Sequence, residues 1–234
     1  MNVQRWARIA GALFLISLVA GGFGEAYAPS KIIVSGDAVA TAANIRNFEF
    51  LYRLGFAAFL IESLCDIALV VILYLLLRPV NKGLSLMAAL IALVGTAVFA
   101  VAELFYLAPV LILRDATGYL STFSPEQLYS VVLLSLKFYS FGGMITTAYY
   151  GLGWLIRGYL IYRSGYLPKF IGVLMAIGGL GFVVRNFLLI LAPAYAPTWL
   201  LMLMFPGGLI LGVWLVVKGV DVSKWKARVE ASSS

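Results

Sequence analysis

The chain has 234 residues, of which 63% are hydrophobic and only 12% are charged. Soluble domains are about a quarter charged, so this composition excludes an ordinary soluble enzyme and indicates a polytopic membrane protein. The net charge of +7 does not indicate a nucleic-acid binder, because most of the Lys and Arg residues lie between long apolar runs.

Two features of the composition limit the chemistry that this chain can perform. It contains no histidine, which is the usual ligand of zinc, haem and di-iron centres and the usual catalytic base. Its one cysteine, Cys65, cannot form an internal disulfide. We therefore expect no metal and no cofactor, and chemistry restricted to carboxylate, amine, guanidinium and hydroxyl groups.

Apolar segments long enough to cross a bilayer recur along the chain. A spanning helix needs roughly 20 mostly apolar residues. Six segments meet this length, at residues 7–28, 51–77, 84–112, 127–160, 168–193 and 197–217. The sequence therefore predicts an all-α bundle of six transmembrane helices, forming one domain over residues 1–220. A short polar tail over residues 221–234 is expected to be cytoplasmic and frayed.

The distribution of basic residues predicts the orientation of the bundle, because Lys and Arg favour cytoplasmic loops. With the N-terminus inside, the cytoplasmic side carries Arg5, Arg8, Arg78, Lys82, Arg157, Arg163, Lys169, Lys218, Lys224, Lys226 and Arg228. The opposite side carries only Lys31, Arg46, Arg53 and Arg114. We therefore expect both termini in the cytoplasm and a multi-pass protein of the bacterial inner membrane.

The first span has a second interpretation, as a secretory signal. Arg5 and Arg8 precede an apolar run that ends in Ala26-Tyr27-Ala28, which is typical of a cleavage site for such a signal. Pro29 would directly follow the cut, where proline is generally avoided. Because of this proline and of the length of the apolar run, we expect the first helix to be retained.

A short helix is predicted between the first two spans. Asp37 is a good cap, and apolar residues recur after it at helical spacing, at Ala38, Ala42, Ile45 and Phe48. This pattern predicts a short amphipathic helix that lies on the outer surface and continues into the second span.

Three further segments have local signals. Residues 124–127, with the sequence SPEQ, form a capping box with proline at the first helical position. Residues 78–83 are typical of a tight turn. In the sixth span, residues 206–208 (PGG) indicate either a hinge or a packed kink.

The first hundred residues carry a series of short motifs: GDAVATAANI at 36–45, LYRLG at 51–55, CDIAL at 65–69 and LRPVNK at 77–82. Together they resemble the multi-pass membrane family described as domain of unknown function 4386. The resemblance implies a membrane fold and no particular activity. The third span of that family often carries an Arg and a Gln where this chain has Ala92 and Gly95, so what those side chains handle elsewhere is handled differently here or not at all.

Five ionisable side chains lie well inside the predicted spans: Glu62, Asp66, Glu103, Lys137 and Arg185. Each such residue costs about 2.5 kcal/mol or more in the hydrocarbon layer, so it is a candidate functional residue. We expect all five to face the interior of the bundle, where small residues let helices approach closely and the two bases can meet the acids.

Three acids against two bases leave one carboxyl group without a basic partner. Such a group takes up a proton or holds a cation, because burial disfavours its charge. Glu62 and Asp66 are the better candidates for this proton, since two carboxylates one turn apart do not both ionise cheaply. The five residues are therefore the predicted ligand-binding or ion-binding site, although buried charges can also serve only to fix helix packing.

Three functions remain open from the sequence. The first is a proton-coupled, permease-like protein that binds a small polar or amphiphilic ligand, with Lys137 and Arg185 facing an anionic or zwitterionic group. The second is a non-catalytic accessory or structural subunit of a membrane assembly, indicated by its 23 glycines and its small-residue stripes. An intramembrane enzyme is disfavoured, because Glu62 and Asp66 are too close on one helix to act as an attacking pair, although Glu62 with Glu103 could hold a divalent metal. The expected partners are the lipid bilayer, a small-molecule or lipid ligand, and a second copy of the chain or a larger complex.

Overall fold

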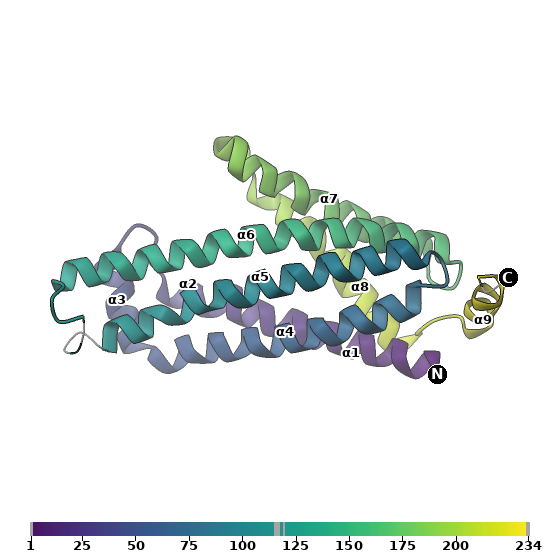
Figure 1. The fold of residues 1–234 in the computed structure, drawn as a ribbon, viewed down its shortest axis with the longest axis horizontal. Helices are drawn as coiled ribbons and strands as arrows, with labels where there is room; N and C mark the ends of the chain where they lie inside the picture. Colours follow the sequence, from purple (N-terminus) through teal and green to yellow (C-terminus); the bar gives the residue numbers. More distant parts are fainter. Residues whose placement is uncertain (1, 115–117, 119, 233–234) are drawn as a thin grey trace. The chain divides into compact units, whose positions relative to one another are not determined.

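The computed structural model of the chain describes residues 2–114, 118 and 120–232, apart from the side chain of Met204. Throughout these residues the regular structure is helical (Figure 1). Six helical segments are long and apolar enough to cross a membrane, at Val3–Ile32, Glu49–Leu77, Lys82–Arg114, Pro125–Ser164, Lys169–Leu191 and Thr198–Val217. The predicted all-helical chain with six candidate spans is thus confirmed.

The helices in chain order follow the sequence prediction closely, with short helices added between the spans and two additions of more consequence. They are α1 (Val3–Gly21), η1 (Gly22–Tyr27), α2 (Ala28–Ile32), α3 (Ala38–Asn47), α4 (Glu49–Leu77), α5 (Lys82–Arg114), α6 (Pro125–Ser164), α7 (Lys169–Leu191), η2 (Pro193–Tyr195), η3 (Thr198–Leu203), α8 (Met204–Val217) and α9 (Val222–Ala231). The additions are η1, a π-helical turn at the end of the first span, and α9.

The predicted start signals operate through local hydrogen bonds. Ser124 and Gln127 form a reciprocal capping box, in which the Ser124 N–H donates to Gln127 Oε1 and the Gln127 N–H donates to Ser124 Oγ. Asp37 caps α3 by accepting from the Ala40 N–H. The face of α3 that contains Ala42 and Ile45 is buried, as expected for an amphipathic helix.

The predicted frayed tail is wrong for the described part of it. Asp221 caps α9 by accepting a hydrogen bond from the Lys224 N–H. Hydrogen bonds from the Ser223 hydroxyl and from that N–H hold the pKa of Asp221 below its usual value, so the acceptor stays charged at neutral pH. Trp225 then donates from Nε1 to the carbonyl of Leu76 at the end of α4, which attaches the helix to the bundle. Ser233 and Ser234 lie outside the described residues.

Pro206 lies at a position where it does not disrupt the hydrogen bonds of its helix. The preceding residues form the 3-10 helix η3, so Pro206 falls in the first turn of α8. A proline there removes no α-helical hydrogen bond, since the first N–H groups of a helix have no partner within it. The segment is therefore a change of helix type at a helix start.

The chain divides into two compact units. Unit 1 contains residues 1–16, 64–96 and 144–234, and unit 2 contains residues 17–63 and 97–143. Four long helices, α1, α4, α5 and α6, contribute residues to both.

Unit 1 has a core of aliphatic side chains in which α6 and α7 pack through glycine. The helix α7 turns back along α6 (Figure 1). A Cβ atom at Gly158 would lie 2.6 Å from the Gly172 carbonyl oxygen, and one at Gly151 would lie 2.8 Å from that of Gly179. The two backbones are therefore in direct contact, as small residues allow in membrane helices.

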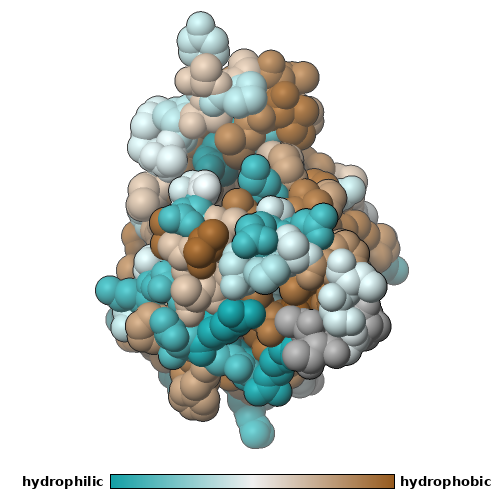
Figure 2. Space-filling view, turned by 90° about the vertical axis from the view of Figure 1, so that its left-hand side faces the viewer, coloured by the Kyte–Doolittle hydropathy of each residue, from teal (hydrophilic) through white to brown (hydrophobic). Residues whose placement is uncertain are grey.

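Unit 2 has a core rich in aromatic rings. Tyr52 of α4 and Tyr106 of α5 stack with centroids 4.3 Å apart, and the Tyr52 hydroxyl donates to the Tyr106 carbonyl. In the end view of Figure 2, hydrophilic residues gather on the end that carries α3. There Glu49 accepts hydrogen bonds from Arg53 and Arg114 at 2.7 and 2.8 Å, which joins the start of α4 to the end of α5.

A proline inside α5 interrupts the backbone hydrogen bonds of this helix in unit 2. Pro109 has no N–H, so it leaves the Phe105 carbonyl without its helical donor. Ser135 of α6 replaces that donor, because its hydroxyl donates to the Phe105 carbonyl at 2.7 Å. A hydroxyl from a neighbouring helix thus satisfies the carbonyl that the proline exposes.

This replacement predicts an energetic coupling between Ser135 and Pro109. Ser135→Ala should destabilise the protein by about 1–3 kcal/mol, because it leaves a buried carbonyl unsatisfied. The loss should be much smaller in a Pro109→Ala background, where the backbone at this position regains its N–H. Unfolding in detergent measures both, with Ser140→Ala on the exposed side of α6 as the control. Equal losses in the two backgrounds would contradict the coupling.

Candidate functional site

The five predicted site residues fall into both units of the chain. In unit 2, Glu103 of α5 is almost completely buried at 2% exposure, Glu62 of α4 is half-buried, and Lys137 of α6 is exposed. In unit 1, Asp66 of α4 and Arg185 of α7 are half-buried. Each unit is therefore described with its own polar residues.

Glu103 is the most deeply buried acid among the predicted residues. The described residues give its carboxylate one hydrogen bond, from Ser63 Oγ to Oε1 at 3.4 Å, which is long for this type of bond. A single weak donor compensates little of the energy that an ionised carboxylate loses on leaving water. Glu103 is thus held where a charge needs a further partner.

Two more acidic residues lie on neighbouring elements of unit 2. Glu62 directly precedes Ser63, whose hydroxyl donates to Glu103. Glu25 directly follows Gly24, which lies against the ring of Phe59, and Phe59 packs on Tyr139 of α6. Glu25, Glu62, Glu103 and Tyr139 come from η1, α4, α5 and α6, and we call them the acidic site. Glu62 and Glu103 were predicted from the sequence, whereas Glu25 was not selected although it lies inside the predicted first span.

The π-helical turn η1 brings the first span close to α4. A Cβ atom at Gly21 would lie 2.7 Å from Glu62 Oε1, and one at Gly24 would lie 3.0 Å from the Gly55 carbonyl oxygen. A larger residue at Gly21 would displace the Glu62 carboxylate, and one at Gly24 would press on the α4 backbone. The wide turn carries Glu25, and π-helical turns inside α-helices are often found at functional sites.

Aromatic rings pack around the acidic site. The ring of Phe59 lies 5.7 Å from those of Phe99 and Tyr139 and 5.0 Å from that of Tyr106, measured between centroids. These rings pack on Tyr139 of the acidic site and make its surroundings apolar, and an apolar environment strengthens electrostatic interactions. Their faces are also suited to an organic cation.

The predicted inward orientation of Lys137 is wrong. Its side chain is exposed on α6. Among the residues that the structure describes, neither Lys137 nor Glu103 nor Arg185 forms an ion pair. The predicted pairing of these two bases with the acids is therefore not found in the described part of the chain.

Asp66 belongs to a hydrogen-bonded network within unit 1. The Tyr150 hydroxyl of α6 donates to Asp66 Oδ2 at 2.8 Å, and Thr96 Oγ1 of α5 lies 2.9 Å from the same hydroxyl. Gly95 makes room for the Tyr150 ring, because a Cβ atom there would lie 2.9 Å from Tyr150 Cδ1. Three helices are thus joined through one carboxylate and two hydroxyl groups.

Arg157 was missed as a buried residue. It was counted among the cytoplasmic bases, but it is only 9% exposed on α6, and the charges of Asp66 and Tyr150 act on it. Its Nη2 atom has no hydrogen-bond partner in the described part of the chain. The available signal was its spacing, since Arg157 is seven residues after Tyr150 and so shares its helix face.

A second polar group in unit 1 joins α6 and α7. Asn186, which is 1% exposed, donates from Nδ2 to Thr147 Oγ1 at 2.9 Å. Asn186 Oδ1 and Arg185 Nε are buried without a hydrogen-bond partner within the described ranges. The sequence analysis selected Arg185 but not its neighbour Asn186, which is the more deeply buried of the two.

No group of three or more Asp, Glu, Cys or His residues with the geometry of a metal site occurs among the described residues. The predicted pairing of Glu62 with Glu103 around a divalent ion thus stays a prediction without a third ligand of these types in the described part.

These features define a multi-pass helical membrane protein with polar side chains buried inside its candidate spans. The sequence profile of the domain of unknown function DUF4386 matches residues 9–219, and the chain belongs to this family. A relative from Archaeoglobus fulgidus, described as an uncharacterized protein, is 30% identical over 159 residues, which cover 68% of this chain and 80% of the relative. No solved structure matches the chain.

The Asp66 network yields a prediction about stability. Tyr150→Phe removes the donor to Asp66 and the partner of Thr96, so it should lower the free energy of unfolding by about 1–3 kcal/mol. Tyr149→Phe is the matched control, because the adjacent Tyr149 is exposed and has no hydrogen bond among the described residues. Chemical unfolding in detergent measures both variants. If they unfold alike, the network contributes nothing to stability.

Proposed function

We propose that this protein binds a small amphiphilic cation at the acidic site and exchanges it for a proton, as a permease does. The observation that carries this proposal is the burial of the Glu103 carboxyl group with one long hydrogen bond, from Ser63, which directly follows Glu62 on α4.

The charge of the site decides which ligand it fits. The sequence suggested an anionic or zwitterionic group facing Lys137 and Arg185. In unit 2, however, Lys137 is exposed, and the most deeply buried carboxyl group is that of Glu103. A carboxylate repels an anion and attracts a cation, so the sign of the proposed ligand is reversed.

Exchange with a proton follows from the energy of burial. An ionised carboxylate in a low-dielectric site is unfavourable unless a cation or several donors compensate it. Glu103 therefore carries a proton when the site is empty and loses it when a cation arrives. Because the two states exclude each other, binding of the cation and release of the proton are coupled. Glu103 thus replaces Glu62 and Asp66 as the candidate for the exchanged proton.

The aromatic rings favour an organic cation over a small metal ion. Phe59, Phe99 and Tyr106 offer apolar surface and ring faces beside the carboxylates, and such faces attract weakly hydrated cations. The described residues contain no group of three or more Asp, Glu, Cys or His side chains placed to hold a metal ion.

The alternative of an accessory subunit loses part of its motivation. Its main support was the small-residue stripes, which can serve as contact faces for a partner. On α6 and α7 these glycines contact each other, at Gly151 with Gly179 and Gly158 with Gly172. They are therefore used inside the chain and do not require another protein.

We also propose that both termini lie in the cytoplasm and that the protein resides in the cytoplasmic membrane, with α3 on the outer side. The support is the distribution of Lys and Arg between the predicted loops. The variant Ser232→Cys in a Cys65→Ala background should react with an impermeant thiol reagent only after the cells are opened. Reaction in intact cells would contradict this orientation.

Proton exchange is tested by titrating the purified protein with tetraphenylphosphonium. This cation carries no titratable proton, so any proton released on binding comes from the protein. Calorimetry in two buffers of different ionisation enthalpy should detect proton release by the unmodified protein. Glu103→Gln should abolish the release and weaken binding by about tenfold or more, because it removes both the proton that is released and the carboxylate charge that pairs with the cation.

Glu230→Gln is the matched control, since Glu230 is exposed on α9 and the same substitution there should change neither quantity. If the Glu103→Gln protein binds the cation with unchanged affinity and proton release, the proposed role of the acidic site is wrong. Failure of the unmodified protein to bind the cation would likewise count against the proposed ligand class.

A further inference from the structure

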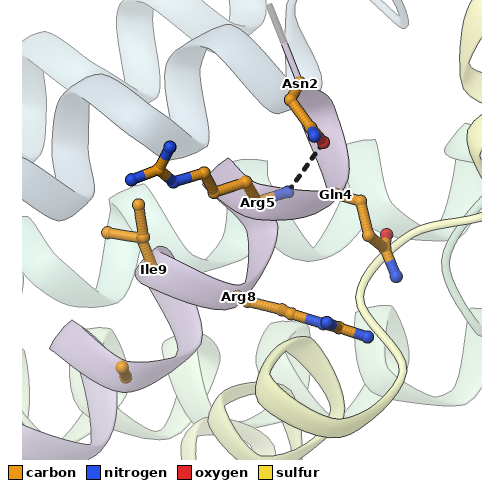
Figure 3. Close-up of a pocket in the computed structure, with 6 residues that line it drawn as sticks. Asn2, Gln4, Arg5, Arg8 and Ile9 are labelled. Atoms are coloured by element: carbon orange, nitrogen blue, oxygen red, sulfur yellow. Dashed lines mark hydrogen bonds between the residues drawn. The ribbon is translucent and has the colours of Figure 1, made fainter.

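We propose that a pocket at the start of α1 binds the phosphate group of an anionic phospholipid, with two arginines at its headgroup end. The cavity has a volume of about 390 Å³ and is lined by Asn2, Gln4, Arg5, Arg8, Ile9 and Ala12 (Figure 3). It lies within unit 1 and shares no residue with the acidic site. The proposal is thus independent of the proposed transport function.

The two arginines are available to a ligand. Arg5 and Arg8 are three residues apart on α1, and both are exposed. Among the described residues, neither guanidinium group forms a hydrogen bond or an ion pair, and the one bond drawn at Arg5 in Figure 3 is from its backbone N–H to Asn2. In that view the two side chains extend in different directions from the helix. Each offers a planar set of donors that suits phosphate oxygens.

One wall of the pocket is fixed by hydrogen bonds. Gln4 donates from Nε2 to the Lys218 carbonyl at 2.8 Å and accepts at Oε1 from the Val220 N–H at 3.0 Å. Between these two residues, Gly219 has φ +68°, and a Cβ atom there would collide with the Gln4 side chain. The start of α1 is therefore held against the connection between α8 and α9, and this wall is formed before any ligand arrives.

The other part of the pocket is apolar, which distinguishes a lipid from free phosphate. Ile9 and Ala12 line the cavity below the arginines, and Ile16 continues this exposed apolar face along α1. Trp6, also exposed, stands at the same level as the arginines, and tryptophan favours the headgroup region of a bilayer. A phosphate with an attached acyl chain matches both ends of the pocket.

Other exposed bases of unit 1 lack this environment. Lys224 and Lys226 are exposed on α9, but neither lines the pocket. General attraction of a basic surface for an anionic membrane would depend on them as much as on the arginines. They therefore provide a control that removes the same charge.

The experiment is native mass spectrometry of the full chain in detergent, with added phosphatidylglycerol or phosphatidylcholine. The protein should bind phosphatidylglycerol about tenfold or more tightly than phosphatidylcholine, because the choline charge cancels that of the phosphate. Arg5→Gln with Arg8→Gln should abolish this preference, whereas Lys224→Gln with Lys226→Gln should retain it. Arg5→Lys with Arg8→Lys should give an intermediate value, because lysine keeps the charge without the planar fork.

Three results would overturn the proposal. One is a lack of preference between the two lipids by the unmodified protein, which needs no variant to be folded. Another is an equal loss of preference in the arginine and lysine double variants, which would show general surface attraction. The third is binding of inorganic phosphate alone with the same dependence on the arginines and the same affinity as phosphatidylglycerol, which would identify a free-phosphate site.

Discussion

A carboxyl group inside the hydrocarbon layer is neutral or has a compensating partner, and this constraint governs the arrangement of unit 2. Glu103 meets it with one long hydrogen bond from Ser63. The aromatic rings of the same unit make an ionised carboxylate there less favourable, since they offer apolar surface in place of water. What completes the site is therefore a proton or a cation, and the proposed exchange is the alternation between these two.

The irregular parts of the helices in unit 2 lie near its buried carboxyl groups. The π-helical turn η1 carries Glu25 and passes close to Glu62 through Gly21. The proline position in α5 lies about one and a half turns beyond Glu103, and the carbonyl that it exposes is satisfied by Ser135. In unit 1, Asp66 accepts a hydrogen bond from the Tyr150 hydroxyl. The helices α6 and α7 of that unit pack closely through glycine residues. In unit 2 the Glu103 carboxylate has only the long hydrogen bond from Ser63, which is the feature on which the proposed exchange depends.

The sequence was most informative where a structure is determined by nearby residues. The six spans follow from length and apolarity, and the caps at Asp37 and Ser124 follow from side chains within three residues of the helix start. The side that faces the neighbours was harder to predict on α6, which is 40 residues long. Positions many turns apart drift around such a helix, so Gly151 is buried while Lys137 on the predicted stripe is exposed.

The other misses depend on tertiary contacts. Arg157 shares a face of α6 with Tyr150, but its burial and the nearby charge of Asp66 on α4 depend on how the helices pack, which spacing along α6 does not show. Glu25 approaches the acidic site through a π-helical turn, which has no reliable sequence signal. The tail is ordered because Trp225 reaches the Leu76 carbonyl, 149 residues away in the chain. Site residues of this kind become visible only when the helices are placed beside one another.

The central claim is that Glu103 holds a proton in the empty site and gives it up to a cation. Infrared difference spectroscopy of the protein in lipid measures this directly, through the carbonyl stretch of a protonated carboxyl group, assigned by its absence from Glu103→Gln. The account predicts this band at neutral pH and its loss when tetraphenylphosphonium is added. A spectrum in which the unmodified protein and Glu103→Gln show no difference in this band would contradict it.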